Sequence, residues 1–149
     1  MLSKDDLVKQ IDMDALLNMD RYAGGHDAQM KGLIKGAKVI THWNSGDYQG
    51  QVATCIRIPS GEFVIYNDYY GSCSGCDAWE DATDEQVKKM CNDLVYSSYI
   101  FDRFSEVLDF LNKAISKESG NYSWDESCAE PLLNELMKEA FEIDGKKKS

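Results

Sequence analysis

The chain has 149 residues, a formal net charge of −10 and no apolar run as long as a membrane span, and its charged start, M-L-S-K-D-D-L, is unlike a secretory signal. This length can bury one core, so we expect residues 1–149 to form a single soluble, intracellular domain. The acidity disfavours nucleic acid as a direct partner and favours a basic protein surface, because phosphate binding depends on Lys and Arg.

The first part of the chain predicts short helices. Residues 3–21 carry leucine and isoleucine among acids and lysines at roughly helical spacing. This pattern indicates one amphipathic helix or a broken pair of helices, with Ser3 as the N-cap. Residues 27–34 are expected to add another turn or two of helix, with Asp27 as the cap.

The middle of the chain predicts strands. Residues 38–43, 51–58 and 62–69 are rich in β-branched and aromatic side chains, and the turn-forming stretches N-S-G-D and P-S-G separate them. We therefore expect a three-stranded antiparallel meander. Period-two alternation in the second strand places Val52, Thr54, Ile56 and Ile58 on one face and Ala53, Cys55 and Arg57 on the other.

A C-x-x-C turn follows the third predicted strand. Cys73 and Cys76 lie in the stretch Y-Y-G-S-C-S-G-C-D-A-W-E-D, where Gly75 tolerates the positive φ that a tight turn needs. Two sulfurs at this spacing can face one tetrahedral ion, so the stretch predicts half of a metal site. A turn with two reduced thiols is the simpler alternative, and a redox pair is disfavoured because no βαβ unit follows.

Helical spacing returns after this turn. Thr83 and Gln86 have the form of a capping box, residues 102–117 carry the clearest apolar stripe of the chain, and a last helix is expected from near Ser127, with Pro131 in its first turn. These elements predict an α+β fold. Its three-stranded antiparallel sheet is flanked by N-terminal and C-terminal helices, and the C-x-x-C turn follows the third strand.

The predicted metal site needs further ligands from other parts of the chain. Five cysteines, an odd number, in a reducing compartment argue against a disulfide framework. Thiolates with imidazole favour zinc, in a closed structural site that contributes to folding. The ligand set that we predict is Cys73, Cys76, Cys91 and Cys55, and the alternatives are His26, His42, Asp77 and Cys128. The apolar stripe that contains Cys91 is equally typical of a plain buried cysteine.

Acidic residues gather around the same turn. No Lys or Arg lies between Arg57 and Lys88, whereas acids are frequent there. We expect an acidic patch that binds a basic groove, with aromatic side chains as anchors. The alternative is a solvated surface whose acids are favoured by a helix N-terminus. The predicted partner-binding residues are Trp79, Glu80, Asp81, Asp84 and Glu85.

Motifs of catalysis are weak in this chain. It has two histidines and lacks G-x-S-x-G, H-E-x-x-H and a phosphate-binding glycine loop. We therefore expect a protein that is not an enzyme. A catalytic zinc with one open coordination position is the alternative.

Three motifs resemble those of a known group of proteins. They are D-Y-Q-G at 47–50, Y-G-S-C-S-G-C-D-A-W-E at 70–80 and F-x-x-x-x-x-x-L-x-F-L at 101–111, and they span about the central half of the chain. The chain resembles small acidic proteins of phages and prophages and is similar to zinc-containing anti-CRISPR proteins that inhibit Cas9. Cys73 and Cys76 lie within the matching motif.

The resemblance implies a non-enzymatic inhibitor with a structural zinc in the cytoplasm of a bacterial host. Its acidic surface would bind Cas9, or another basic host protein that handles nucleic acid, and block guide or target engagement. It would bind neither nucleic acid directly nor a membrane. Two alternatives stay open: a zinc-dependent hydrolase of a small host-defence signalling molecule, and a phage accessory protein that binds an unknown target.

Overall fold

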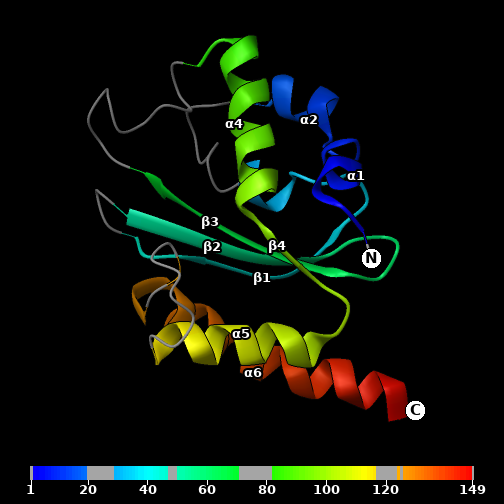
Figure 1. Cartoon of the computed structure of the whole chain (residues 1–149), viewed down its shortest axis with the longest axis vertical. Helices are drawn as coiled ribbons and strands as arrows, with labels where there is room; N and C mark the ends of the chain where they lie inside the picture. Colours follow the sequence, from blue (N-terminus) through cyan, green and yellow to red (C-terminus); the bar gives the residue numbers. More distant parts are fainter. Residues whose placement is uncertain are drawn as a thin grey trace.

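The fold has a central β-sheet with helices on both faces. A computed structural model describes residues 2–19, 29–46, 50–70, 82–116, 124 and 126–148. Figure 1 shows α1, α2 and α4 over one face of the sheet and α5 and α6 over the other. The elements are α1 (Lys4–Val8), α2 (Met13–Leu17), β1 (Lys38–Asn44), β2 (Gly50–Arg57), β3 (Phe63–Tyr70), α4 (Asp84–Ser97), β4 (Tyr99–Phe101), α5 (Phe104–Ile115) and α6 (Glu126–Lys148).

The sheet confirms the predicted α+β class and antiparallel meander but adds a strand to it. The strand order is β1-β2-β3-β4, and all three neighbouring pairs are antiparallel. The prediction of three strands was therefore wrong. The fourth strand has three residues and pairs Tyr99 with Ile65 and Phe101 with Phe63. It is too short to show period-two alternation, and it lies between two segments of helical spacing.

The sheet register confirms the alternation predicted for the second strand. β1 pairs with β2 so that His42 lies opposite Thr54 and Trp43 opposite Ala53, with an irregularity between Val39 and Thr41. Side chains of β2 enter two different clusters of buried residues, one on each face of the sheet. We call them the α4-side core and the α6-side core.

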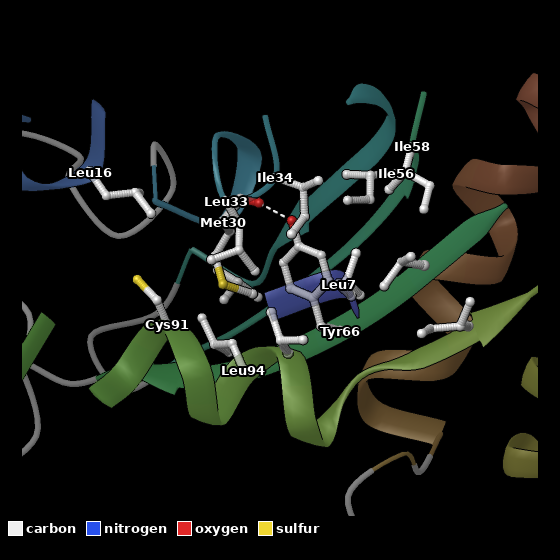
Figure 2. Packing of buried hydrophobic residues seen from close by; sticks show 14 of the residues in the cluster. Leu7, Leu16, Met30, Leu33, Ile34, Ile56, Ile58, Tyr66, Cys91 and Leu94 are labelled. Atoms are coloured by element: carbon white, nitrogen blue, oxygen red, sulfur yellow. Dashed lines mark hydrogen bonds between the residues drawn. The ribbon is translucent and has the colours of Figure 1, made fainter. Parts of the chain in front are cut away.

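In the α4-side core, side chains of the N-terminal helices and of α4 pack together on one face of the sheet (Figure 2). The hydroxyl of Tyr66 on β3 donates a hydrogen bond to the backbone carbonyl of Met30, and Tyr66 is 1% exposed. Because this tyrosine is surrounded by apolar atoms, burial raises its pKa. The buried residues of this core are Leu7, Leu16, Met30, Leu33, Ile34, Val52, Ile56, Ile58, Val64, Tyr66, Ala82, Val87, Cys91, Leu94, Val95 and Ile100.

The α6-side core is mainly aliphatic and aromatic. The rings of Phe63 and Phe104 lie 5.5 Å apart between centroids, and those of Phe110 and Trp124 meet edge to face at 6.2 Å. The buried residues of this core are Ala53, Cys55, Phe63, Ile65, Phe104, Val107, Leu111, Ala114, Trp124, Cys128, Ala129, Leu132, Leu133 and Leu136.

Local capping explains where several helices begin. Ser3 accepts a hydrogen bond from the Asp6 amide at 3.1 Å, as predicted for an N-cap. The capping box at α4 is also confirmed, because Thr83 accepts from the Gln86 amide at 3.2 Å and the Gln86 side chain accepts from the Thr83 amide at 2.9 Å. The last helix begins at Glu126, and Pro131 lies past its first turn rather than in it.

The N-terminal segment forms the broken pair of helices that the sequence allowed. α1 and α2 are five residues each, and between them Ile11 makes an isolated β-bridge to Ile34. Of the short helix predicted over 27–34, residues 29–31 are helical, and the predicted cap Asp27 lies outside the described residues. In the described ranges, no helix is long and apolar enough to cross a membrane.

Candidate functional site

Several predicted site residues lie outside the described residues. The segment 71–81 contains the C-x-x-C motif, for which a turn was predicted, and the segment 20–28 contains one of the two histidines. The predicted residues in these segments are His26, Cys73, Cys76, Asp77, Trp79, Glu80 and Asp81. The structure does place the two residues that flank the C-x-x-C segment, Tyr70 and Ala82.

The chain returns from the C-x-x-C segment on the α4 side of the sheet. β3 ends at Tyr70, and the next described residue, Ala82, is buried in the α4-side core at 7% exposure. α4 begins at Asp84, and Cys91 lies about two helical turns further along. The helix that carries Cys91 is thus the element that directly follows the predicted metal-binding turn.

The Cys91 sulfur is buried and accepts a hydrogen bond. The side-chain amide nitrogen of Gln29 lies 3.6 Å from this sulfur, and both residues are buried. Burial raises the pKa of the Cys91 thiol, and the hydrogen bond from Gln29 opposes that rise in part. Gln29 was not predicted as a site residue, because a single glutamine next to a short helix carries no recognisable pattern.

Cys55 lies on the opposite face of the sheet from Cys91. It belongs to the α6-side core and is fully buried, and burial raises the pKa of its thiol to about 12. Its neighbours Thr54 and Ile56 point the other way, as alternation in a strand requires. The structure therefore does not bring Cys55 and Cys91 together, and the predicted four-sulfur set cannot surround one ion.

His42 points toward the α4 side. Its Nδ1 lies 2.8 Å from the hydroxyl oxygen of Thr54, which is directly opposite in the register and fully buried. His42 and Cys55 thus lie on different faces of the sheet, so the predicted ligand Cys55 and the alternative ligand His42 do not face each other. A nucleophile and base pair built from Cys55 and His42 is excluded by the same geometry.

Cys128 belongs to the α6 side. It lies in the first turn of α6, buried at 1% exposure, and the amide nitrogen of Asn67 is 3.6 Å from its sulfur. Asn67 alternates with Tyr66 along β3 and so faces α6 rather than α4. Of the alternative ligands that can be placed, His42 is on the α4 side and Cys128 is not.

The predicted ligand Cys91 and the alternative ligand His42 lie on the α4 side of the sheet. Thiolate and imidazole are the ligands that zinc prefers, and Cys91 and His42 supply one of each on the face where the C-x-x-C segment returns. Among the residues described, no three His, Cys, Asp or Glu side chains are grouped closely enough to hold an ion. The predicted ligands Cys73 and Cys76 lie outside the described residues.

Two predicted partner-binding residues are placed by the structure. Asp84 and Glu85 occupy the first turn of α4 and are exposed. Glu85 forms an ion pair with Lys88 at 3.5 Å, and its side chain is 86% exposed. Negative charge is favoured at this end of a helix, where the backbone N–H groups are unpaired. Other exposed acids in the same layer are Asp5, Asp6, Asp14 and Asp93.

The far end of α4 is fixed by the N-terminal helix. The Lys4 ammonium donates hydrogen bonds to the carbonyls of Tyr96, at 2.8 Å, and of Ser98. These carbonyls end the helix, so the positive charge also complements the helix dipole. Tyr96, which is 52% exposed, donates through its hydroxyl to Asp5 at 2.5 Å. The hydrogen bond to Asp5 raises the pKa of the Tyr96 phenol.

Comparisons of the chain with protein-family models, with curated proteins and with solved structures gave no match.

Proposed function

We propose that this protein is a non-enzymatic inhibitor that binds a basic surface of the CRISPR effector nuclease Cas9 and blocks nucleic-acid engagement. A structural zinc would stiffen the docking region. The observation that supports this proposal best is the placement of Asp84 and Glu85. They are exposed on the first turn of a helix that is held at both ends and follows directly on the acidic C-x-x-C segment.

α4 presents these acids in a fixed orientation. Its N-terminus is closed by the Thr83 and Gln86 capping box, and its C-terminus is closed by Lys4. Its inner face packs Val87, Cys91 and Leu94 into the α4-side core. A preorganised surface loses less conformational entropy on binding than a flexible one, so acids on this helix can contribute more to affinity.

The charge of the chain suits a partner that normally binds nucleic acid. Such a partner carries Lys and Arg arranged to neutralise phosphates, and a protein with net charge −10 can occupy the same groups. Opposite charge also speeds the encounter, and this contribution is screened by salt. The proposed complex should therefore weaken as the salt concentration rises.

The zinc part of the proposal names Cys73, Cys76 and Cys91 as sulfur ligands, with His42 or Asp77 as the fourth. Bound in a closed site, zinc would contribute to folding rather than to chemistry. Cys55 is no longer included, because the sheet separates it from Cys91. Elemental analysis of the purified chain is expected to give about one zinc per chain, because structural sites hold a single four-coordinate ion.

The binding experiment compares two charge-reversal variants that differ only in their position. Asp84→Lys with Glu85→Lys changes the α4 side, and Asp102→Lys with Asp109→Lys makes the same change of charge beside α5. Asp102 and Asp109 are exposed, and Asp109 pairs with Lys113 at 3.2 Å. Affinity for Cas9, with and without its guide RNA, is measured by titration at two salt concentrations.

We expect the α4 variant to bind Cas9 at least about tenfold more weakly, with a smaller salt dependence, since close charge pairs across an interface contribute on the order of 1.5 kcal/mol or more. The α5 variant should bind as the unmodified chain does. Equal loss in both variants would indicate a non-specific effect of net charge. The absence of any complex between the unmodified chain and Cas9 would refute the proposal.

A further inference from the structure

Three cations near the hairpin between β2 and β3 have no acidic partner. The chain has 26 acidic residues against 16 Lys and Arg, so opposite charge is abundant. Lysines on the helices use it, because ion pairs are formed by Lys88, Lys89, Lys113 and Lys138. By contrast, Lys35, Lys38 and Arg57 are exposed and form no ion pair within the described part of the chain.

The backbone brings these cations to one end of the sheet. Lys38 on β1 and Arg57 on β2 lie directly opposite each other in the register, so their side chains share a face. Lys35 precedes β1 by three residues. It is followed by Gly36, at which a Cβ would lie 3.2 Å from the Pro59 ring just beyond β2. Like charges directly opposite on neighbouring strands destabilise a sheet, and a bound anion would remove that repulsion.

The guanidinium of Arg57 is held in one orientation. Its Nε donates to the Gly61 carbonyl at 3.2 Å, and its central carbon lies 5.0 Å from the centroid of the Phe63 ring. These contacts leave the two terminal nitrogens as donors, and a fixed planar pair of N–H groups matches two oxygens of one anion. Glu62, the acid nearest to Arg57 in sequence, accepts instead from the Ser60 hydroxyl at 2.6 Å.

We propose that Arg57 and Lys38, with Lys35 beside them, form a binding site for a phosphate group. A phosphate carries up to two charges and several acceptor oxygens, so it suits three cations better than a single carboxylate does. Protection of a sheet edge would explain a lysine on β1, but β2 has a strand on each side, so it does not explain Arg57.

This site goes beyond the proposed function and does not depend on it. The proposed docking acids, Asp84 and Glu85, lie in the first turn of α4. Figure 1 shows the start of α4 at the top of the molecule and the β2–β3 hairpin at the right. The net charge of −10 disfavours nucleic acid for the chain as a whole, whereas the local charge of this end is positive.

The test adds two probes separately to the full chain, inorganic phosphate and a short single-stranded oligonucleotide, and follows backbone amides by NMR. We expect saturable shifts at amides 35–38 and 57–63. If the oligonucleotide binds more tightly than inorganic phosphate, with an affinity that falls steeply with salt, the phosphate belongs to a nucleic-acid backbone. If the two probes bind equally, it belongs to a small phosphorylated molecule. Absence of binding by both probes would refute the site.

The variants show which side chains bind the phosphate. Arg57→Gln and Lys38→Gln should each weaken binding by about tenfold or more, because each removes a hydrogen bond to a charged group. Arg57→Lys keeps the charge but not the planar fork, so its affinity should fall between those of Arg57→Gln and the unmodified chain. As the control, Lys113→Gln removes a positive charge from a lysine paired with Asp109, and binding should be unchanged.

Shifts that do not saturate, or that persist in Arg57→Gln and Lys38→Gln, would mean that no site exists here. An equal loss in Lys113→Gln would show only an effect of net charge. If Arg57→Gln lowers the free energy of unfolding by losing its contacts with Gly61 and Phe63, Lys38→Gln decides the result.

Discussion

The two layers of helices pack against the same sheet but bury different kinds of side chain. The α6-side core is built from α5 and α6, which pack aromatic and aliphatic side chains against β2 and β3. The α4-side core joins segments far apart in the chain and includes the Tyr66 hydroxyl, and the buried polar side chains of Gln29 and Thr54 lie on the same side of the sheet. Buried polar groups need specific partners, so this layer is more sensitive to small changes. The C-x-x-C segment returns to this polar layer.

The largest effect is expected from cavities cut into either core. Leu16→Ala on the α4 side and Leu111→Ala on the α6 side each truncate a fully buried leucine and should cost about 2–5 kcal/mol of unfolding free energy in urea titrations. The rate at which each variant releases zinc to a chelator distinguishes the two cores further. Leu16→Ala should release zinc to a chelator faster, and Leu111→Ala should do so only as far as it unfolds the whole domain. If the two variants are equally stable and release zinc at the same rate, the zinc site does not belong to the α4 side.

A smaller effect is expected from one hydroxyl. Tyr66→Phe removes the donor to the Met30 carbonyl and leaves that buried oxygen without this partner, so it should cost about 1–3 kcal/mol. The matched substitution Tyr96→Phe removes a hydroxyl on an exposed residue, and little change is expected. Both are measured by chemical denaturation at neutral pH. A Tyr66→Phe variant as stable as the unmodified chain would contradict a dependence of this core on its polar contacts.

The capping box of α4 should contribute less than the buried groups. Thr83→Ala removes the acceptor for the Gln86 amide and is expected to cost about 1 kcal/mol, whereas Thr83→Ser keeps the hydroxyl and should cost less. If α4 presents the docking acids, the Ala variant should also bind Cas9 somewhat more weakly than the Ser variant. Identical binding and stability in both would mean that the cap does not orient the helix.

The Cys55 thiol should not react with alkylating reagents at neutral pH. Because its thiol is buried, with a pKa raised from 9.0 to about 12, it should resist alkylation at pH 8 and react only after unfolding, as peptide mapping by mass spectrometry would show. The folded state holds this proton more tightly than the unfolded state. The resulting stability is complete below about pH 9 and is lost as pH rises toward 12. Rapid native labelling of Cys55 would contradict its place in the α6-side core.

Local patterns in the sequence predicted much of the fold. Ser3 as an N-cap, the Thr83 and Gln86 capping box and the two faces of the second strand follow from neighbours within a few residues, and the structure confirms them. β4 was missed because three residues carry no periodic signal. It is a strand because Phe63–Tyr70 offers it an edge to pair with.

The candidate site was less predictable, because it depends on which helix covers which face. Alternation along β2 separates Cys55 from Thr54, but only the packing of α4 shows that Cys91 lies on the side of Thr54. The contact between Gln29 and Cys91 joins residues 62 positions apart, and no local pattern indicates it. Ligands drawn from several elements are fixed by tertiary packing, which a single sequence does not reveal.

We propose that the α4 side of the molecule binds the partner and that the α6 side supports it. Hydrogen exchange of the full chain, with and without Cas9, tests this most directly, because binding slows the exchange of covered amides. The predicted result is added protection of amides 82–90 at the start of α4, with no change across α5 and the described part of α6. Protection confined to α5 and α6, or none anywhere in the presence of Cas9, would contradict the claim.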